Sequence, residues 1–247
     1  MPNSSIDSKD NKKIKLIRKL RLKKNRYKEN KFVIESRKLM EEALGEGAPI
    51  EFILLREDIQ KTYEGYQVFH TSREIFDGIS ELTSPDGYMA VVSFPKIEIV
   101  ESDRVLLLDR LSDPGNLGTI IRSSEAFGFN KIYLLDTVDP YNDKTLRASM
   151  GSIFRVCLEF IGLEELTDIK KNYQIYVAHM NGEDYRQEIY AGKVCLVIGN
   201  EANGISQDLF RLADKSVKIP MKGRLESLNA AISASLIMSQ IDYIKNK

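Results

Sequence analysis

Three predicted strands in the second half of the chain each lead into a loop rich in glycine, asparagine or proline, and then into a helix. Two of these strands, residues 105–108 and 194–198, are unbroken aliphatic runs, and the third spans residues 216–219. Unbroken apolar runs, unlike alternating ones, are typical of strands that are covered on both faces, as in parallel sheets. We therefore predict an α/β domain with a mostly parallel sheet, and ligands of such sheets bind at the loops that follow the strands.

The first part of the chain shows a similar alternation of short strands and short helices. Strands are predicted at residues 31–35, 50–55, 66–70 and 89–94. A short helix is predicted at residues 57–62. The stretch from residue 95 to residue 103 is charged and irregular, which is typical of a linker. We therefore expect a small α/β domain over residues 1–98, followed by a second domain over residues 103–247.

Positive charge is concentrated at the N-terminus of a chain whose net charge is zero. Residues 1–31 contain twelve Lys or Arg and three Asp or Glu, a net charge of +9, so the remainder carries −9. Residues 1–9 are predicted to be disordered, and apolar residues at helical spacing predict a basic helix from Asp10 to about Lys24. A basic arm of this kind suits a phosphate-bearing partner. A solvated basic helix without a ligand would have the same composition.

Several classes of protein are excluded by what the sequence lacks. No G-x-G-x-x-G or Walker sequence follows a strand, which removes support for a dinucleotide or nucleoside triphosphate site. Cys157 and Cys195 lie in apolar runs, as buried thiols of a reducing compartment do. His70 and His179 are far apart, so no metal-ligand spacing is present. Because no apolar run is long enough to span a bilayer, we expect a cytoplasmic protein without a membrane segment or a metal.

The three strand–loop–helix stretches together resemble the three motifs of the SpoU (TrmH-type) family of RNA ribose 2'-O-methyltransferases, which belongs to the SPOUT superfamily. The resemblance covers roughly residue 106 to the end of the chain. The residues that carry it are the N-x5-R pair Asn116 and Arg122, the G-N-E triplet at 199–201, and the I-P-M and S-L-N sequences at 219–221 and 227–229. The fold that it implies is an α/β knot, in which the C-terminal segment is threaded through a loop.

The activity that the resemblance implies is methyl transfer from S-adenosyl-L-methionine to a ribose 2'-hydroxyl of RNA. Because this methyl donor is already activated, the protein needs only to align the reacting groups and to stabilise charge on the oxygen. The implied catalytic residues are Asn116, Arg122, Glu201, Ser227 and Asn229. The implied cofactor-binding residues are Ala178, Met180, Gly199, Asn200, Ile219, Met221 and Leu228.

The role of Arg122 follows from the chemistry of its side chain. A guanidinium with a pKa above roughly 12 keeps its proton, so Arg122 is a poor general base. We expect it to stabilise the ribose oxyanion or to hold a neighbouring phosphate. The alternative is an ion pair with Glu125 on the helix surface, which would contribute less than about 1 kcal/mol.

The N-terminal domain resembles the L30-like substrate-binding domain that precedes many rRNA members of the family. The match is the R-x4-K-F-V-x-E pattern of residues 26–35, and it departs from the family at Ser36, where glycine is usual. This domain favours rRNA, most of all 23S rRNA, as the substrate. The alternatives are a tRNA ribose methyltransferase, a non-catalytic ribosome-associated RNA-binding protein, and a nucleotide-binding regulatory protein. The RNA-binding candidates are Arg18, Lys19, Arg21, Lys23, Lys24, Arg26 and, in an R-x-S-x-G stretch, Arg147.

The final helix is predicted to run from Leu228 to Lys245, with Ser227 in the N-cap position. Apolar residues lie around much of its circumference, so its own sheet would cover only part of it. A second copy of the chain would cover the rest, and members of the resembled family pair through this region. We therefore predict a homodimer formed through the methyltransferase domain.

Overall fold

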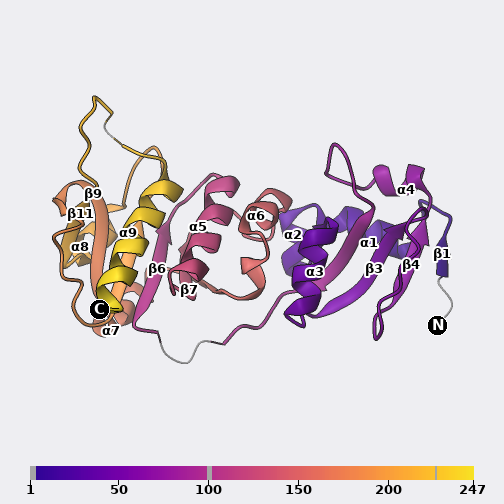
Figure 1. Cartoon of the computed structure of the whole chain (residues 1–247), viewed down its shortest axis with the longest axis horizontal. Coiled ribbons are helices and arrows are strands. Elements are labelled where there is room, and N and C mark those ends of the chain that lie inside the picture. Colours follow the sequence, from indigo (N-terminus) through magenta and orange to yellow (C-terminus); the bar gives the residue numbers. More distant parts are fainter. Residues whose placement is uncertain (1–3, 99–101, 226) are drawn as a thin grey trace. The chain divides into compact units, whose positions relative to one another are not determined.

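A computed structural model describes residues 4–98, 102–225 and 227–247, and the chain divides into two compact units (Figure 1). Unit 1 contains the chain up to Lys96 together with Tyr141–Phe154, and unit 2 contains Ile97–Pro140 and Arg155–Lys247. In the part of the chain that the structure describes, no helix is both long enough and apolar enough to cross a membrane.

Unit 1 is built on a five-stranded mixed sheet. Its strands are β1 (Ser4–Ile6), β2 (Lys31–Glu35), β3 (Ile50–Arg56), β4 (Val68–Thr71) and β5 (Tyr88–Ser93), in the order β1-β4-β3-β5-β2. The pairs β1–β4 and β4–β3 are parallel, and the pairs β3–β5 and β5–β2 are antiparallel. Its helices are α1 (Lys12–Leu20), α2 (Lys23–Glu29), α3 (Arg37–Gly45), α4 (Arg73–Asp77) and α6 (Asp143–Ser149), with a 3-10 turn η1 (Ser152–Phe154).

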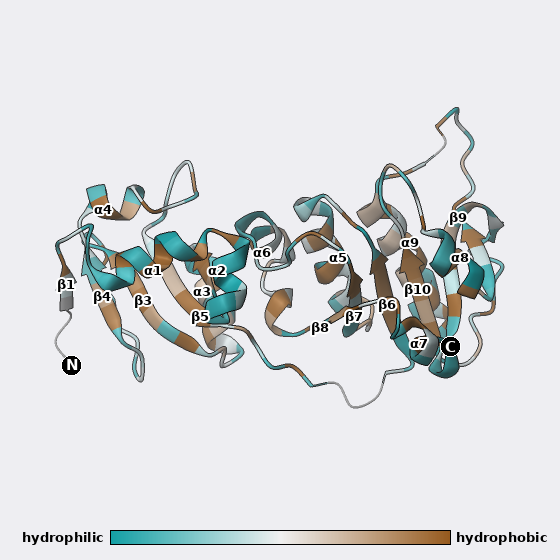
Figure 2. Ribbon diagram, turned by 180° about the vertical axis from the view of Figure 1, so that it is seen from behind, coloured by the Kyte–Doolittle hydropathy of each residue, from teal (hydrophilic) through white to brown (hydrophobic). Residues whose placement is uncertain are grey.

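The basic N-terminal segment is folded into unit 1 and is not an extended arm. The Asn11 side chain accepts a hydrogen bond from the Lys13 backbone at 2.9 Å and so caps α1. Ile14, Ile17 and Leu20 are buried in the same core cluster as residues of β2, β3 and β5. The basic side chains occupy the outward positions, and α1 and α2 are accordingly hydrophilic in Figure 2. This burial explains why so charged a segment is ordered.

Three predictions for unit 1 were wrong. The single helix expected to run to about Lys24 ends at Leu20, and α2 follows it as a separate helix. Residues 4–6, which were expected to be disordered, form β1 because they find a parallel partner in β4; residues 1–3 lie outside the described residues. Residues 57–62 contain a turn and no helix.

Unit 2 is built on a six-stranded sheet in which every pair of neighbours is parallel. Its strands are β6 (Arg104–Asp109), β7 (Lys131–Leu135), β8 (Cys157–Ile161), β9 (Gln174–Asp184), β10 (Val194–Ile198) and β11 (Lys215–Lys218), in the order β11-β9-β10-β6-β7-β8. Its helices are α5 (Pro114–Ala126), α7 (Leu166–Asn172), α8 (Gln207–Leu212) and α9 (Ala230–Lys245). The predicted parallel sheet is confirmed.

Both faces of this sheet are covered, as the unbroken aliphatic runs predicted. Every residue of β10 is buried, and β6, β7 and β10 are brown along their length in Figure 2. Helices α7 and α8 pack on one face, where Leu166, Ile169 and Leu209 join alternate residues of the strands. Helix α9 contacts β10 and packs along α5, where the Ser235 hydroxyl donates to the Ser123 hydroxyl at 2.8 Å. The Ser124 hydroxyl of α5 also donates to the Met238 sulfur of α9 at 3.7 Å, so the contact between the two helices is partly polar.

The connection between β7 and β8 contributes to the core of unit 1. Phe32 on β2 is fully buried, and its ring centroid lies 4.9 Å from that of Tyr141 and 6.3 Å from that of Phe154. Phe94 stacks on Tyr141 at 4.2 Å. Residues 141–154 were assigned to the second domain from the sequence, whereas their packing groups them with unit 1.

Substitution of a core residue in the basic segment tests whether this segment is folded. Ile17→Ala is expected to lower the free energy of unfolding by about 2–5 kcal/mol, as is usual for a buried isoleucine. Leu22→Ala, in the same segment but at a side chain that is 64% exposed, is expected to change it by less than about 0.5 kcal/mol. Urea titration of the whole protein, followed by circular dichroism, measures both. Equal stability of the two variants would mean that the segment lies outside the core.

Candidate active site

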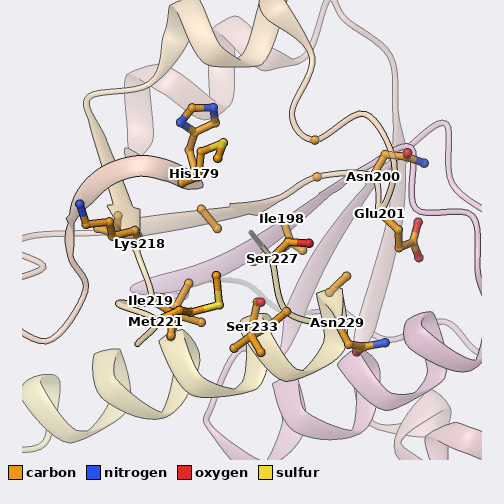
Figure 3. Close-up of a pocket in the computed structure, with 18 of the residues that line it drawn as sticks. His179, Ile198, Asn200, Glu201, Lys218, Ile219, Met221, Ser227, Asn229 and Ser233 are labelled. Carbon is orange, nitrogen blue, oxygen red and sulfur yellow. The ribbon is translucent and has the colours of Figure 1, made fainter. Parts of the chain in front are cut away.

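A cavity of about 980 Å³ opens at the carboxyl ends of β9, β10 and β11, within unit 2 (Figure 3). Its volume falls in the range of about 300–1,000 Å³ that is usual for small-molecule sites. The residues proposed for the cofactor all line it, namely Ala178, Met180, Gly199, Asn200, Ile219, Met221 and Leu228. Glu201, Ser227 and Asn229 also line it, whereas Asn116 and Arg122 do not.

The loop after β10 forms one wall of the cavity and is internally braced. The Asn200 side chain accepts from the backbone N–H groups of Ala202 and Asn203, at 2.9 and 3.0 Å, and donates to the carbonyl of Arg110 at 2.7 Å. Asn200 and Gly204 exchange two backbone hydrogen bonds. The Asn200 side chain therefore stabilises the conformation of the loop. Asn200 would contribute to ligand binding indirectly, through the loop surface that it stabilises.

Close approach of the backbone explains the glycine at position 199. A Cβ atom added there would lie 2.5 Å from the carbonyl carbon of Gly204 and 2.6 Å from the nitrogen of Ile205. Contacts this short force the backbone to move. The turn therefore requires glycine, and its backbone is left exposed toward the cavity.

A buried carboxylate joins this loop to β6, and the sequence analysis gave it no role. Asp109 is fully buried at the end of β6, where it accepts from the Ser206 N–H at 2.6 Å and from the Arg110 guanidinium at 2.9 Å. The sequence does contain a signal for this residue, because Asp109 directly follows the aliphatic run of a predicted strand. A buried charge of this kind is retained only where it is paired, so Asp109 fixes the spacing of the first and second loops.

Glu201 links the second loop to the start of α5. Its carboxylate accepts from the side chain of Asn116 and from the hydroxyl of Ser112, both at 2.9 Å. It also accepts from the backbone N–H groups of Ser112 and Asp113, each at 3.3 Å. Burial alone would raise the pKa of Glu201, but these hydrogen bonds outweigh it and hold the pKa below its ordinary value. Glu201 is therefore an anion that accepts hydrogen bonds, and it is badly placed to act as a base at neutral pH.

Asn116 and Asn229 complete a chain of hydrogen bonds across the three motifs. The Asn229 amide donates to the Asn116 side-chain oxygen at 2.8 Å. The other end of Asn229 accepts from the backbone N–H groups of Ala231 and Ile232, so it is the N-cap of α9. The predicted cap at Ser227 and the predicted start at Leu228 were wrong, because Asn229 is held in the capping position by Asn116. Likewise α5 begins at Pro114, where Asp113 caps it by accepting from the Asn116 N–H at 2.7 Å.

Arg122 has an exposed side chain on α5. Among the described residues, its guanidinium has neither a hydrogen-bond acceptor nor an ion-pair partner. Glu125, the partner expected for a purely structural arginine, is held by Arg155 at 2.5 Å. Ser227 is also exposed, and its hydroxyl bonds to none of the described residues. Both side chains are thus available to a ligand, and their catalytic roles stay predictions.

Residues 178–180 were expected in a strand-end loop but lie within β9. The register of β9 against β11 shifts there: Val177 pairs with Ser216, while Glu183 pairs with Val217. The intervening residues bulge beside the cavity. The ring of His179 packs against Phe210 with the centroids 5.0 Å apart, and its side chain faces the cavity (Figure 3).

The residues predicted to bind RNA fall into three groups. The side chains of Arg18, Lys23 and Lys24 are exposed and have no carboxylate partner in the described part of the chain. Two are paired at the surface: Lys19 with Glu29, and Arg147 with Asp143 at 2.6 Å on α6 of unit 1.

The third group is held inside unit 1. Arg26 is buried and donates to the carbonyls of Leu20 and Arg21, both at 2.8 Å. Arg21 is bound to Glu35 and to the carbonyl of Ile79. Arg21 and Arg26 therefore stabilise the junction between α1 and α2, and their guanidinium groups are largely occupied there.

Metal ligation was also considered. No group of three or more His, Cys, Asp or Glu side chains in residues 4–98, 102–225 and 227–247 is arranged to hold a metal ion. Cys195 is buried and Cys157 partly buried, and burial raises the pKa of both thiols. The polar side chains that line the cavity carry amide, hydroxyl, carboxylate, imidazole and ammonium groups.

Comparison with protein families assigns both parts of the chain. Residues 103–239 match the SpoU rRNA Methylase family, and residues 11–90 match the MRM3-like substrate binding domain. The first match covers the cavity, all three loops and Arg122. The second covers α1 to α4 and most of the unit 1 sheet.

Individual proteins agree with this assignment. The chain is 34% identical over 240 residues to the 23S rRNA (guanosine(2553)-2'-O)-methyltransferase RlmP of Bacillus subtilis (strain 168), covering 94% of this chain and 97% of that protein. It is 27% identical to the mitochondrial rRNA methyltransferase 3 of Homo sapiens, covering 86% of this chain and 67% of that protein. The crystal structure of an AdoMet-bound rRNA methyltransferase from Sinorhizobium meliloti is 29% identical and superposes with a TM-score of 0.86 over 97% of both chains.

A pair of glycine substitutions tests the braced wall of the cavity. Gly199→Ala places a methyl group against the Gly204 backbone and is expected to weaken binding of S-adenosylhomocysteine by about tenfold or more, the equivalent of about 1.4 kcal/mol. Gly223→Ala, in the loop before α9, meets no atom within 4 Å and should bind as the wild type does. Isothermal titration calorimetry measures both affinities. Unchanged binding by Gly199→Ala would show that this turn does not shape the ligand site.

Proposed function

The chain belongs to the SpoU rRNA methylase family, and from this premise we propose that it methylates a ribose 2'-hydroxyl of 23S rRNA with S-adenosylmethionine as methyl donor. The observation that carries the proposal is the meeting of three motif loops at one cavity, with a hydrogen-bonded chain from Glu201 through Asn116 to Asn229. The Bacillus subtilis relative is named for guanosine 2553, so the corresponding guanosine is the candidate target. A substrate in rRNA also favours a cytoplasmic location.

The residues around the cavity fit the methyl donor. The turn at Gly199 supplies exposed backbone on one side, and Ile219, Met221 and Leu228 supply backbone and apolar surface on the other. Apolar surface with a few polar groups is what holds an adenosine ring and its amino-acid tail. When bound, the donor supplies an activated methyl group. The protein then has to bind it, to orient the ribose hydroxyl, and to stabilise the charge that develops on the oxygen.

Arg122 is the residue that we assign to the developing charge. Its guanidinium remains protonated, and among the described residues no carboxylate neutralises it. A fixed positive charge near the ribose oxygen stabilises the alkoxide more than the alcohol, which is the condition for lowering a reaction barrier. The proton passes to water or to a phosphate oxygen, because Glu201 is occupied by hydrogen bonds and held ionised.

Asn116 and Glu201 have positioning roles in this scheme. Asn116 lies at the start of α5, the helix that carries Arg122, and it is fixed at both ends of its amide. Glu201 and Asn229 line the cavity, so the same hydrogen-bonded chain reaches from the donor site to that helix. Loss of either partner is expected to misplace Arg122 with respect to the cavity.

A single-turnover methylation assay tests the activity and the role of Arg122 together. Wild-type protein, with S-adenosylmethionine and a 23S rRNA transcript, is expected to add one 2'-O-methyl group at the candidate guanosine, mapped by mass spectrometry of nuclease fragments. Arg122→Ala is expected to be slower by about a hundredfold or more at saturating RNA and donor, as for loss of one oxyanion donor. Arg122→Lys should recover only part of the rate, because an ammonium restores the positive charge but lacks the planar fork of the guanidinium.

Two outcomes would contradict the proposal in different ways. Methylation by the wild type at a base atom, or of tRNA only, would remove the proposed substrate. A wild-type rate for Arg122→Ala would leave the activity in place but remove Arg122 from the mechanism. Binding of S-adenosylhomocysteine by each variant serves as the control for folding.

We also propose that the enzyme is a homodimer. Ala231, Ala234, Ile237 and Ile241 of α9 are buried within unit 2, as predicted for one face of this helix. Three large apolar side chains of α9 remain exposed: Ile232 by 53%, Leu236 by 39% and Tyr243 by 58%. They recur at positions i, i+4 and i+11, so they form a single stripe along the helix. A second copy of the same stripe would cover it in an isologous interface.

Sedimentation velocity tests this interface. The wild type is expected to sediment as a dimer, and the double substitution Ile232→Glu and Leu236→Glu is expected to shift it to a monomer, because charge would be buried without a partner. Ile189→Glu changes an apolar residue outside α9 that is still more exposed, by 74%, and should leave the dimer intact. A wild-type monomer at all concentrations would refute the homodimer.

A further inference from the structure

The Lys and Arg side chains of unit 2 fall into two groups, those that form an ion pair with a carboxylate and those that do not. Most form ion pairs with a carboxylate, as in Arg104 with Asp242, Arg155 with Glu125 and Lys170 with Asp214. Within the described residues of unit 2, the cations without a carboxylate partner are Arg122, Lys193, Lys218, Lys222, Arg224 and Lys247. Two of them, Lys222 and Arg224, lie on the loop between β11 and α9, and a third, Lys218, is the last residue of β11. The pairing of charge that is general in unit 2 therefore stops at this loop.

The loop joins β11 to α9 and forms the second wall of the cavity. Over residues 219–229 it contains two cations, Lys222 and Arg224, and one acidic residue, Glu226, which lies outside the described residues. The side chains of Lys222, Arg224 and Leu225 are exposed, and the loop projects beyond the end of the sheet (Figure 1). The exposed Lys222 and Arg224 side chains form no ion pair with a described carboxylate, and two such cations close together in sequence suit an anionic partner.

Hydrogen bonding also sets this wall apart from the other one. The loop after β10 is braced by the bridge between Asn200 and Gly204 and by the Asn200 side chain. The described residues from Ile219 to Leu228 donate and accept no hydrogen bond within the described chain. The backbone and the cations of this wall are therefore all available to ligands.

We propose that Lys222 and Arg224 bind backbone phosphates of the substrate RNA beside the target ribose. The proposal rests on the function proposed above and assigns the RNA contact to residues outside the family motifs. The planar guanidinium of Arg224 can hold one phosphate through two hydrogen bonds, while Lys222 acts as a point charge on the neighbouring one. Contacts of this kind fix the position of the strand and are independent of its sequence. Because Met221 of the same loop lines the cavity, phosphates held by the loop would lie next to the methyl donor.

The test compares a charge-neutralised loop with a matched control. The double variant Lys222→Gln and Arg224→Gln removes two exposed cations that have no carboxylate partner among the described residues, so it should fold with the wild-type melting temperature. Lys193→Gln removes an exposed, unpaired cation at the amino end of β10, the end of the strand opposite to the loops. The measurements are affinity for a 23S rRNA fragment at several salt concentrations and affinity for S-adenosylhomocysteine by calorimetry.

The double variant is expected to bind RNA about tenfold more weakly at 0.1 M salt, with a slope of log affinity against log salt that is flatter by about 1.4, or about 0.7 for each lost phosphate contact on a single strand. Its affinity for S-adenosylhomocysteine and the RNA affinity of Lys193→Gln should be unchanged. An unchanged slope would overturn the proposal while leaving the methyltransferase activity intact. Equal loss of affinity for S-adenosylhomocysteine would assign the two cations to the carboxylate of the methyl donor and would likewise overturn it. Absence of RNA binding by the wild type would remove both the function and the phosphate contact.

Discussion

The site depends on the ionised state of Glu201, because that charge sets the direction of every hydrogen bond in the chain that joins the three loops. A carboxylate only accepts, so Asn116 must present its NH2 group to it. The oxygen of Asn116 then faces Asn229, which must in turn present its own NH2 group. This leaves the Asn229 oxygen for the first N–H groups of α9. One anion thereby determines the orientation of two amides and the capping of a helix.

The two walls of the cavity have different physical characters. The β10 wall is shaped before any ligand arrives, by Asn200 from within and by the buried Asp109 from the first loop. The β11 wall is anchored only where it joins the sheet and where Asn229 begins α9. A rigid wall reduces the entropy lost on binding a small ligand, whereas an open and positively charged wall can adapt to a polymer. The rigid wall suits the small methyl donor, and the open wall suits the large RNA.

The sequence was sufficient to predict the parallel sheet and the meeting of the motif loops, because buried aliphatic strands and parallel order together bring strand ends to one edge. It was insufficient wherever two local choices were equally good. Ser227 and Asn229 are both competent helix caps, and the hydrogen bond from Asn229 to Asn116, across more than a hundred residues, decides between them. The basic segment shows the same limit. The spacing of its apolar residues predicted a helix, but the burial of Ile14 and Ile17 depends on strands of unit 1 that lie further along the chain. Arg26 was predicted to be a surface cation. It is instead buried between α1 and α2, because its surroundings also depend on packing that the local sequence does not show.

The passage of residues 141–154 through the core of unit 1 bears on how such enzymes can recombine. Gene fusion usually joins modules end to end, and a breakpoint in the linker between them leaves both intact. Here a breakpoint at residues 98–103 would separate Phe32 from the Tyr141 and Phe154 rings that pack against it, because residues 141–154 would remain with the C-terminal part of the chain. Unit 1 and the crossover between β7 and β8 are thus inherited as one piece. Exchange of substrate specificity among relatives would proceed by substitution at the surface more readily than by transfer of the whole unit.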